Sequence, residues 1–104
     1  MQQPDDLIWR ELWVSLASLL RSYTALHGLS ANRQAVVEWD QTRILVRQGG
    51  RWLKLERQHE AVAWKREDGG QGTLELTEAG RLRGSSGEEE MDLAAEAWAR
   101  ELMQ

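Results

Sequence analysis

Side chains that could carry acid–base or nucleophilic chemistry near neutral pH are few in this chain of 104 residues. The two histidines, His27 and His59, are the groups with an unperturbed pKa closest to neutrality. His27 falls at the end of an expected helix and His59 in an expected turn, and sequence spacing places no second titratable group beside either. Nucleophile-elbow, zinc-protease and phosphate-loop motifs are absent. We therefore expect no enzyme, no catalytic site and no cofactor.

An acidic run, Glu88-Glu89-Glu90 followed by Asp92, is the second feature that could carry chemistry. Carboxylate oxygens are the ligands that hard cations prefer. However, Ser86 with Glu89 also fits a capping box, and acids in a first turn complement the helix dipole. We interpret the run as the start of a C-terminal helix and expect no metal there.

The stretch from Arg43 to Arg57 contains two apolar runs that flank Gly49-Gly50. Glycine takes the positive φ angles that tight hairpin turns require. The apolar residues alternate along both runs, which predicts a half-buried antiparallel hairpin. The positions expected on its core side are Ile44, Val46, Leu53 and Leu55.

The other face of this hairpin is expected to stay open, and Lys65 of the next predicted strand joins it by strand parity. A tryptophan beside basic side chains suits the recognition of anionic or aromatic groups. The alternative is a solvated face whose tryptophan lies under lysine and arginine stems. The candidate partner-binding residues are Trp52, Arg43, Arg47, Lys54 and Lys65.

A long amphipathic helix is predicted over residues 5–27, with Gly28 as its C-cap. One apolar row repeats at spacings of three and four: Leu12, Leu16, Leu19, Tyr23 and Leu26. A second row beside it contains Trp9, Trp13, Ala17 and Leu20. The broad apolar surface indicates either a helix pressed deep into a sheet or an alternative partner or dimer surface at Trp9 and Trp13.

The remaining chain predicts further strands near residues 34–39, 61–66 and 73–77, with a short edge strand at 81–83 and a helix after Ser86. The strongest loop pattern covers residues 67–72. A helix with one apolar stripe and a sheet with one apolar face must cover each other. We expect a single α+β domain over residues 1–104, with an antiparallel sheet of five or six strands and both terminal helices on one face.

Composition narrows the partners that this domain could have. Net charge is −4, and the C-terminal segment after residue 83 is the most acidic part, which makes nucleic acid a poor partner. There are no cysteines, in agreement with a reducing cytoplasm. The uncharged run from Leu12 to Leu20 is too short to span a bilayer and follows acids rather than a basic stretch. We expect a cytoplasmic protein that binds a protein partner or a second copy of itself.

Two resemblances suggest other functions. Arg57-Gln58, Trp64 in the next strand and Gly69-Gly70, together with the order helix, antiparallel sheet, helix, resemble the frataxin-like fold. That resemblance implies iron binding through an acidic ridge on the first helix and first strand. The residues that could form the ridge are Asp5, Asp6, Glu11, Glu38 and Asp40.

The second resemblance is local. The segment Arg66–Gly70, followed by Leu74–Arg81, looks like the wing and following turn of winged-helix transcription regulators. It implies DNA binding by a helix-turn-helix just before the wing, where this chain instead predicts strands. Our leading hypothesis remains a small non-enzymatic binding or adaptor domain that uses the open sheet face or the tryptophan-rich first helix.

Overall fold

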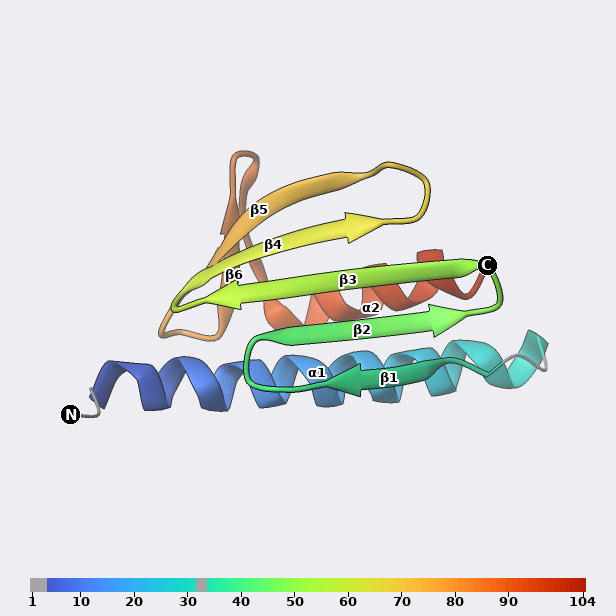
Figure 1. Cartoon of the computed structure of the whole chain (residues 1–104), viewed down its shortest axis with the longest axis horizontal. Helices are drawn as coiled ribbons and strands as arrows, with labels where there is room; N and C mark the ends of the chain where they lie inside the picture. Colours follow the sequence, from blue (N-terminus) through green and yellow to red (C-terminus); the bar gives the residue numbers. More distant parts are fainter. Residues whose placement is uncertain (1–3, 32–33) are drawn as a thin grey trace.

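The computed structural model describes residues 4–31 and 34–104, with the side chains of residues 4–6, 30 and 31 excepted. An N-terminal helix and a C-terminal helix enclose a run of strands, as expected (Figure 1). The elements are α1 (Pro4–Ala31), β1 (Val36–Trp39), β2 (Arg43–Gln48), β3 (Arg51–Gln58), β4 (Ala61–Arg66), β5 (Gln71–Leu76), β6 (Arg81–Gly84), β7 (Gly87–Glu90) and α2 (Met91–Leu102).

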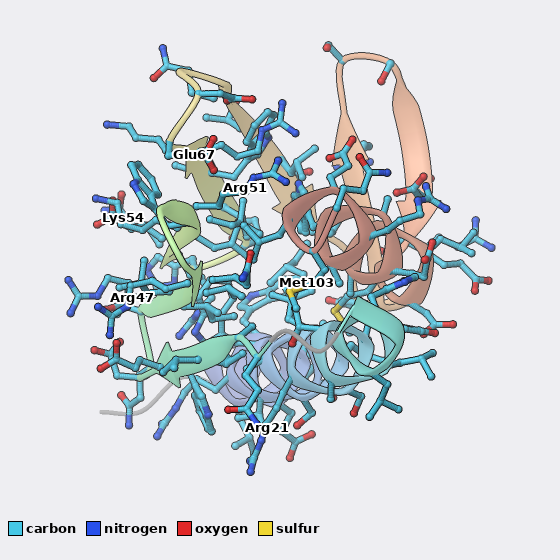
Figure 2. The ribbon with its side chains drawn as sticks, turned by 90° about the vertical axis from the view of Figure 1, so that its right-hand side faces the viewer. Arg21, Arg47, Arg51, Lys54, Glu67 and Met103 are labelled. Carbon is cyan, nitrogen blue, oxygen red and sulfur yellow. The ribbon has the colours of Figure 1, made fainter. Side chains whose placement is uncertain are left out.

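All strands of the described chain form one antiparallel sheet in sequential order, β1 to β7. Each strand therefore pairs with the next one along the chain through a short connection. Both helices lie on the same face of β1–β4, and they also contact each other (Figures 1 and 2). The predicted fold class is confirmed in these respects, but seven strands replace the expected five or six.

The additional strand, β7, corrects the prediction for the acidic run. Arg81–Gly84 and Gly87–Glu90 form a hairpin around the turn residues Ser85-Ser86, and Gly84 pairs with Gly87. The φ of Gly87 is 131°, a value that residues with a Cβ rarely adopt. The predicted capping box at Ser86 and Glu89 is wrong: α2 begins at Met91, and Glu90 stands at its N-cap without a side-chain cap hydrogen bond.

Cross-strand charge explains why the acidic run extends as a strand. Glu88 lies opposite Arg83 and Glu90 opposite Arg81 in the register. Opposite charges directly across a strand pair are stabilising. The Arg81 guanidinium lies 3.8 Å from the Glu90 carboxylate, and Arg83 forms its closest ion pair with Glu75 on β5. Glu88 and Glu90 thus serve sheet pairing, whereas Asp92 of the same run lies in the first turn of α2, as expected.

The central hairpin follows the predicted register. Arg47 pairs with Trp52 and Gln48 with Arg51, which leaves Gly49-Gly50 as the two-residue turn. The four predicted core side chains of the hairpin are buried. Only Gly49 has a positive φ, of 61°, whereas both glycines were expected to need one. A positive φ at the first turn position alone is typical of a type II′ turn.

α1 differs from its prediction at its C-terminal end and in its rotation. The helix continues through Gly28 to Ala31, so Gly28 is not a C-cap. The core side is formed mainly by the second apolar row, in which Trp13, Ala17 and Leu20 are buried, together with Leu16 of the first row. Leu26 of the first row is exposed. The helix is therefore turned so that the expected secondary row faces the sheet.

The turn that resembles a wing joins β4 to β5, and Gly69 and Gly70 lie in it. The segment before it, from Arg43 to Arg66, consists of β2, β3 and β4. A helix-turn-helix does not precede the wing in this part of the chain. No helix among the described residues is long and apolar enough to cross a membrane.

The first prediction concerns the central turn. Gly49→Val should destabilise the fold by about 1–3 kcal/mol, because a β-branched residue resists a positive φ. Gly50→Val is the matched control: a Cβ would meet open space at either position, and Gly50 does not need a positive φ. Thermal or urea unfolding of both variants measures the difference. Equal losses at the two positions would contradict the type II′ assignment.

Candidate functional site

The five residues predicted for the open face lie together on the side of the sheet away from the helices. Arg47 is directly opposite Trp52, and Lys54 is directly opposite Lys65. Residues paired across antiparallel strands point to the same face. Figure 2 shows Arg47 and Lys54 pointing away from the helices. The parity argument from the sequence is thus confirmed for Arg43, Arg47, Trp52, Lys54 and Lys65 as a group.

Acids on the same face of the sheet compensate part of this charge. Arg47 forms an ion pair of 2.7 Å with Glu38 on β1, and the Lys54 ammonium lies 3.7 Å from Glu56. Within the described residues, Arg43 and Lys65 make no ion pair. Lys54 and Lys65 face each other as like charges, an unfavourable arrangement in an isolated sheet. Within the described residues, the positive charges of this face without an ion pair are therefore those of Arg43 and Lys65, and Lys65 lies directly opposite Lys54.

Trp52 lies beside this lysine pair and is half-buried rather than prominent. Its backbone N–H donates to the Glu67 carboxylate at 3.2 Å, which draws Glu67 of the β4–β5 turn toward the start of β3 (Figure 2). The neighbouring Arg51 guanidinium is 3.9 Å from the same carboxylate. Trp52 thus lies at the start of β3 near an acid, which moderates the basic character expected around it.

The alternative surface at Trp9 and Trp13 requires a correction. Trp13 is only 1% exposed, and its indole N–H donates to the carbonyl oxygen of Asp40 at 2.8 Å. The expectation that Trp13 belongs to a partner or dimer surface is therefore wrong for the folded monomer. Trp9 is partly buried and packs against the core. α1 does carry exposed apolar side chains, but they are not those of Trp9 and Trp13.

Most of the exposed large apolar side chains belong to α1 and β1. Eight large hydrophobic residues are exposed in the described chain, and seven of them belong to these two elements. Four of the seven line hollows between these two elements, and we name them the α1–β1 flank: Leu7, Val14, Leu29 and Trp39. Val36 pairs with Arg47 and therefore lies on the open face, and Ile8 and Leu26 line neither hollow. The eighth, Leu93, lies on α2. Exposed apolar side chains that line a common seam are typical of interaction surfaces.

Two hollows follow the seam between α1 and β1. One, of about 310 Å³, is lined mainly by apolar groups that include Leu7, Val14 and Trp39. The other, of about 390 Å³, lies farther along α1 and includes Leu29, Ala35 and Val37. β1 is also the outer strand of the sheet, so one of its edges has no strand partner. A sequence signal was available: the first strand of a sequential sheet is an edge strand, and this one carries Val36 and Trp39.

The carboxylates implied by the frataxin-like resemblance do not converge in the described structure. The side chains of Asp5 and Asp6 lie outside the described part. Glu38 is paired with Arg47, and Asp40 is engaged in its own turn. Glu11 lines the smaller hollow on the flank. Among the described residues, no three His, Cys, Asp or Glu side chains are grouped as a metal site requires.

Asp40 instead organises the turn between β1 and β2. Its carboxylate accepts hydrogen bonds from the backbone N–H groups of Thr42, at 2.9 Å, and Arg43, at 2.8 Å. These hydrogen bonds, with that of Thr42 the largest cause, hold the pKa of Asp40 below its usual range. Its carbonyl oxygen accepts the Trp13 indole N–H, so the same residue joins the turn to α1.

Two side-chain pairs join the helices, and sequence spacing did not reveal either. The Tyr23 hydroxyl donates to the Asp92 carboxylate at 2.6 Å, and this hydrogen bond is the main cause that raises the pKa of Tyr23. One turn farther along α1, His27 Nε2 lies 2.7 Å from the Glu96 carboxylate. The fold therefore places beside His27 a titratable group, Glu96, that sequence spacing did not predict.

Compared with protein-family profiles, with curated proteins and with solved structures, the chain gives no match. The surfaces described above are therefore the features that bear on function.

The second prediction follows from the lowered pKa of Asp40. A carboxyl group with a depressed pKa in the folded state stabilises the fold above its unfolded pKa of about 4 and loses that contribution as the pH falls through the folded value. Asp40→Asn keeps an oxygen acceptor for the turn but has no titrating group. Its melting temperature should therefore decline less than that of the wild type between about pH 4 and pH 2.

Asp40→Ala serves as the comparison, since it loses the acceptor as well and should melt at a lower temperature than Asp40→Asn at neutral pH. Thermal unfolding followed by circular dichroism at several pH values measures both effects. Parallel acid profiles for the wild type and Asp40→Asn would show that Asp40 does not contribute to the acid sensitivity.

Proposed function

We propose that this protein is a non-enzymatic binding domain that associates through the α1–β1 flank. The observation that supports this function is that four of the eight exposed large hydrophobic residues in the described chain line the seam between α1 and β1. Burial of such side chains on association contributes about 25 cal/mol per Å² of apolar surface. The hollows along the same seam would receive protruding apolar side chains of the partner.

The partner to which we commit is a second copy of the chain. α1 has 28 residues and is therefore roughly 42 Å long. A strip of that length, two or three side chains wide, approaches the roughly 800 Å² per partner of a stable interface. Arg10 and Glu11 adjoin the hollow at Leu7, so both signs of charge are present for a two-fold contact. The free edge of β1 offers backbone groups to the second β1.

The open sheet face remains uncovered in such a dimer, since it lies on the side of the sheet away from the helices. The opposed Lys54 and Lys65 support a second role for this face, which is the docking of an acidic segment of another protein beside Trp52. A carboxylate placed between two lysines would relieve their repulsion. A dimer would present this face twice and act as a bivalent adaptor.

The third prediction tests the flank. Val14→Glu and Trp39→Glu should each shift the protein to monomer, because a charge would have to be buried in the interface. Leu93→Glu is the matched control, since Leu93 is an exposed large hydrophobic residue outside the flank. Sedimentation velocity over a range of concentrations measures the mass. A wild-type protein that stays monomeric at high concentration, or a dimer unaffected by both flank variants, would contradict the proposal.

The fourth prediction tests the lysine pair. Lys65→Glu places opposite charges directly across β3 and β4 and should stabilise the fold by about 0.2–1 kcal/mol at low salt. The same change should weaken binding of poly-glutamate, which serves as a model acidic segment. Lys65→Gln should have intermediate effects on both. Thermal unfolding and calorimetric titration make the two measurements.

Stabilisation together with loss of binding would identify the lysine pair as a site kept at the expense of stability. Unchanged poly-glutamate binding by Lys65→Glu would remove the open face from the proposed function without affecting the flank.

A further inference from the structure

A third hollow, of about 430 Å³, lies between α2, the ends of β4 and β5, and the β6–β7 hairpin. In Figure 2 the sheet curves around α2, so that the β6–β7 hairpin stands on the other side of this helix from β3. We name this hollow the α2 groove. Its lining residues include Trp64, Trp98, Leu74, Leu82, Glu89 and Glu101. None of the functions considered so far uses it.

Two indoles form the apolar part of the groove. The ring centroids of Trp64 and Trp98 are 6.4 Å apart, with their planes inclined by 55°. The Arg66 guanidinium carbon lies 5.3 Å from the centre of the Trp64 ring, so this indole already makes one cation–π contact within the fold. Tilted indoles lining a common hollow are the arrangement that binds organic cations in aromatic cages.

Two glycines allow side chains of the groove to pack directly on neighbouring strands. A Cβ at Gly72 would come within 2.8 Å of Trp64 Nε1, so the indole can lie directly on the backbone of β5. A Cβ at Gly84 would come within 2.7 Å of Leu74, which also lines the groove. Both glycines have φ values outside the left-handed region, and the close approach is therefore what requires them.

The charge of the groove is negative. The carboxylates that can face it are those of Glu89 and Glu101, against the single guanidinium of Arg66, because Glu88 points to the other face of β7, opposite Arg83. The Arg66 guanidinium forms an ion pair with the Glu101 carboxylate, with an N–O distance of 2.9 Å. Glu89 lies opposite the buried Leu82 and hence on the inner side of the β6–β7 hairpin, and it forms no ion pair among the described residues. Its carboxylate faces the groove without a protein cation to neutralise it.

We propose that the α2 groove binds a quaternary ammonium head group, with Trp64 and Trp98 in contact with its methyl groups and Glu89 balancing its charge. A quaternary ammonium has no N–H donor, so it needs indole faces and a nearby carboxylate rather than a set of directed acceptors. The groove supplies these groups and the volume typical of small-ligand sites. The site is separate from the α1–β1 flank and does not depend on dimer formation.

The test is a titration of the full chain with choline chloride, followed by the indole N–H signals in ¹H–¹⁵N NMR spectra. The signals of Trp64 and Trp98 should move with saturation, whereas that of the buried Trp13 should stay in place. The neutral isostere 3,3-dimethylbutan-1-ol has the same shape without the charge, and it should bind about tenfold more weakly. Sodium chloride at matched concentration controls for ionic strength.

Two variants complete the test. Glu89→Gln should weaken choline binding several-fold to about tenfold, because it removes the charge that faces the groove. Glu90→Gln is the matched control: Glu90 lies next in the chain, on the open face opposite Arg81. The unchanged Trp13 signal establishes that each variant is folded. Equal affinity for choline and its isostere, equal effects of the two variants, or shifts without saturation would overturn the proposal.

Discussion

The position of α1 depends on one buried arginine. Arg57 points from β3 into the core side of the sheet, and it is 9% exposed. Its guanidinium donates to the carbonyl oxygen of Gln41, at 3.0 and 3.2 Å, and to that of His59, at 3.0 Å. It also lies 6.0 Å from the ring centre of Trp13. A buried charge is tolerated only with such partners, so Arg57 ties two turns of the sheet to α1.

This arrangement decides which residues of α1 remain outside. Trp13 is fixed from two sides, by Arg57 and by the carbonyl oxygen of Asp40, and the helix can then turn no other face toward the sheet. The side chains of Leu7, Val14 and Leu26 are consequently exposed to solvent. β1 ends at the same place, where Asp40 begins the turn into β2. The apolar flank is therefore a consequence of the polar contacts that hold the helix.

The sequence pattern predicted those features of the fold that depend on neighbouring residues, such as strand register. The alternation around Gly49-Gly50 set the register of the central hairpin and the face of Trp52 and Lys54, because a shift by one residue would expose Leu53 and Leu55. The rotation of α1 about its axis was not predictable, because apolar residues cover more than one stripe of this helix. The contacts of Arg57 that fix the rotation join residues far apart in the sequence. At Glu88–Glu90, a capping pattern competed with cross-strand pairing to Arg81 and Arg83, and pairing prevailed.

The curvature of the sheet divides the molecule between two kinds of surface. α1 and α2 cover the core side of the first strands, where Ile44, Leu55 and Val62 are fully buried. Beyond β5 neither helix covers that side completely, and Gly72 and Gly84 occupy positions where larger residues would meet Trp64 and Leu74. The apolar flank along α1 and β1 lies at one edge of the sheet, whereas the α2 groove lies toward the other. Occupation of one surface therefore leaves the other accessible, and a dimer formed through the flank would carry two free grooves.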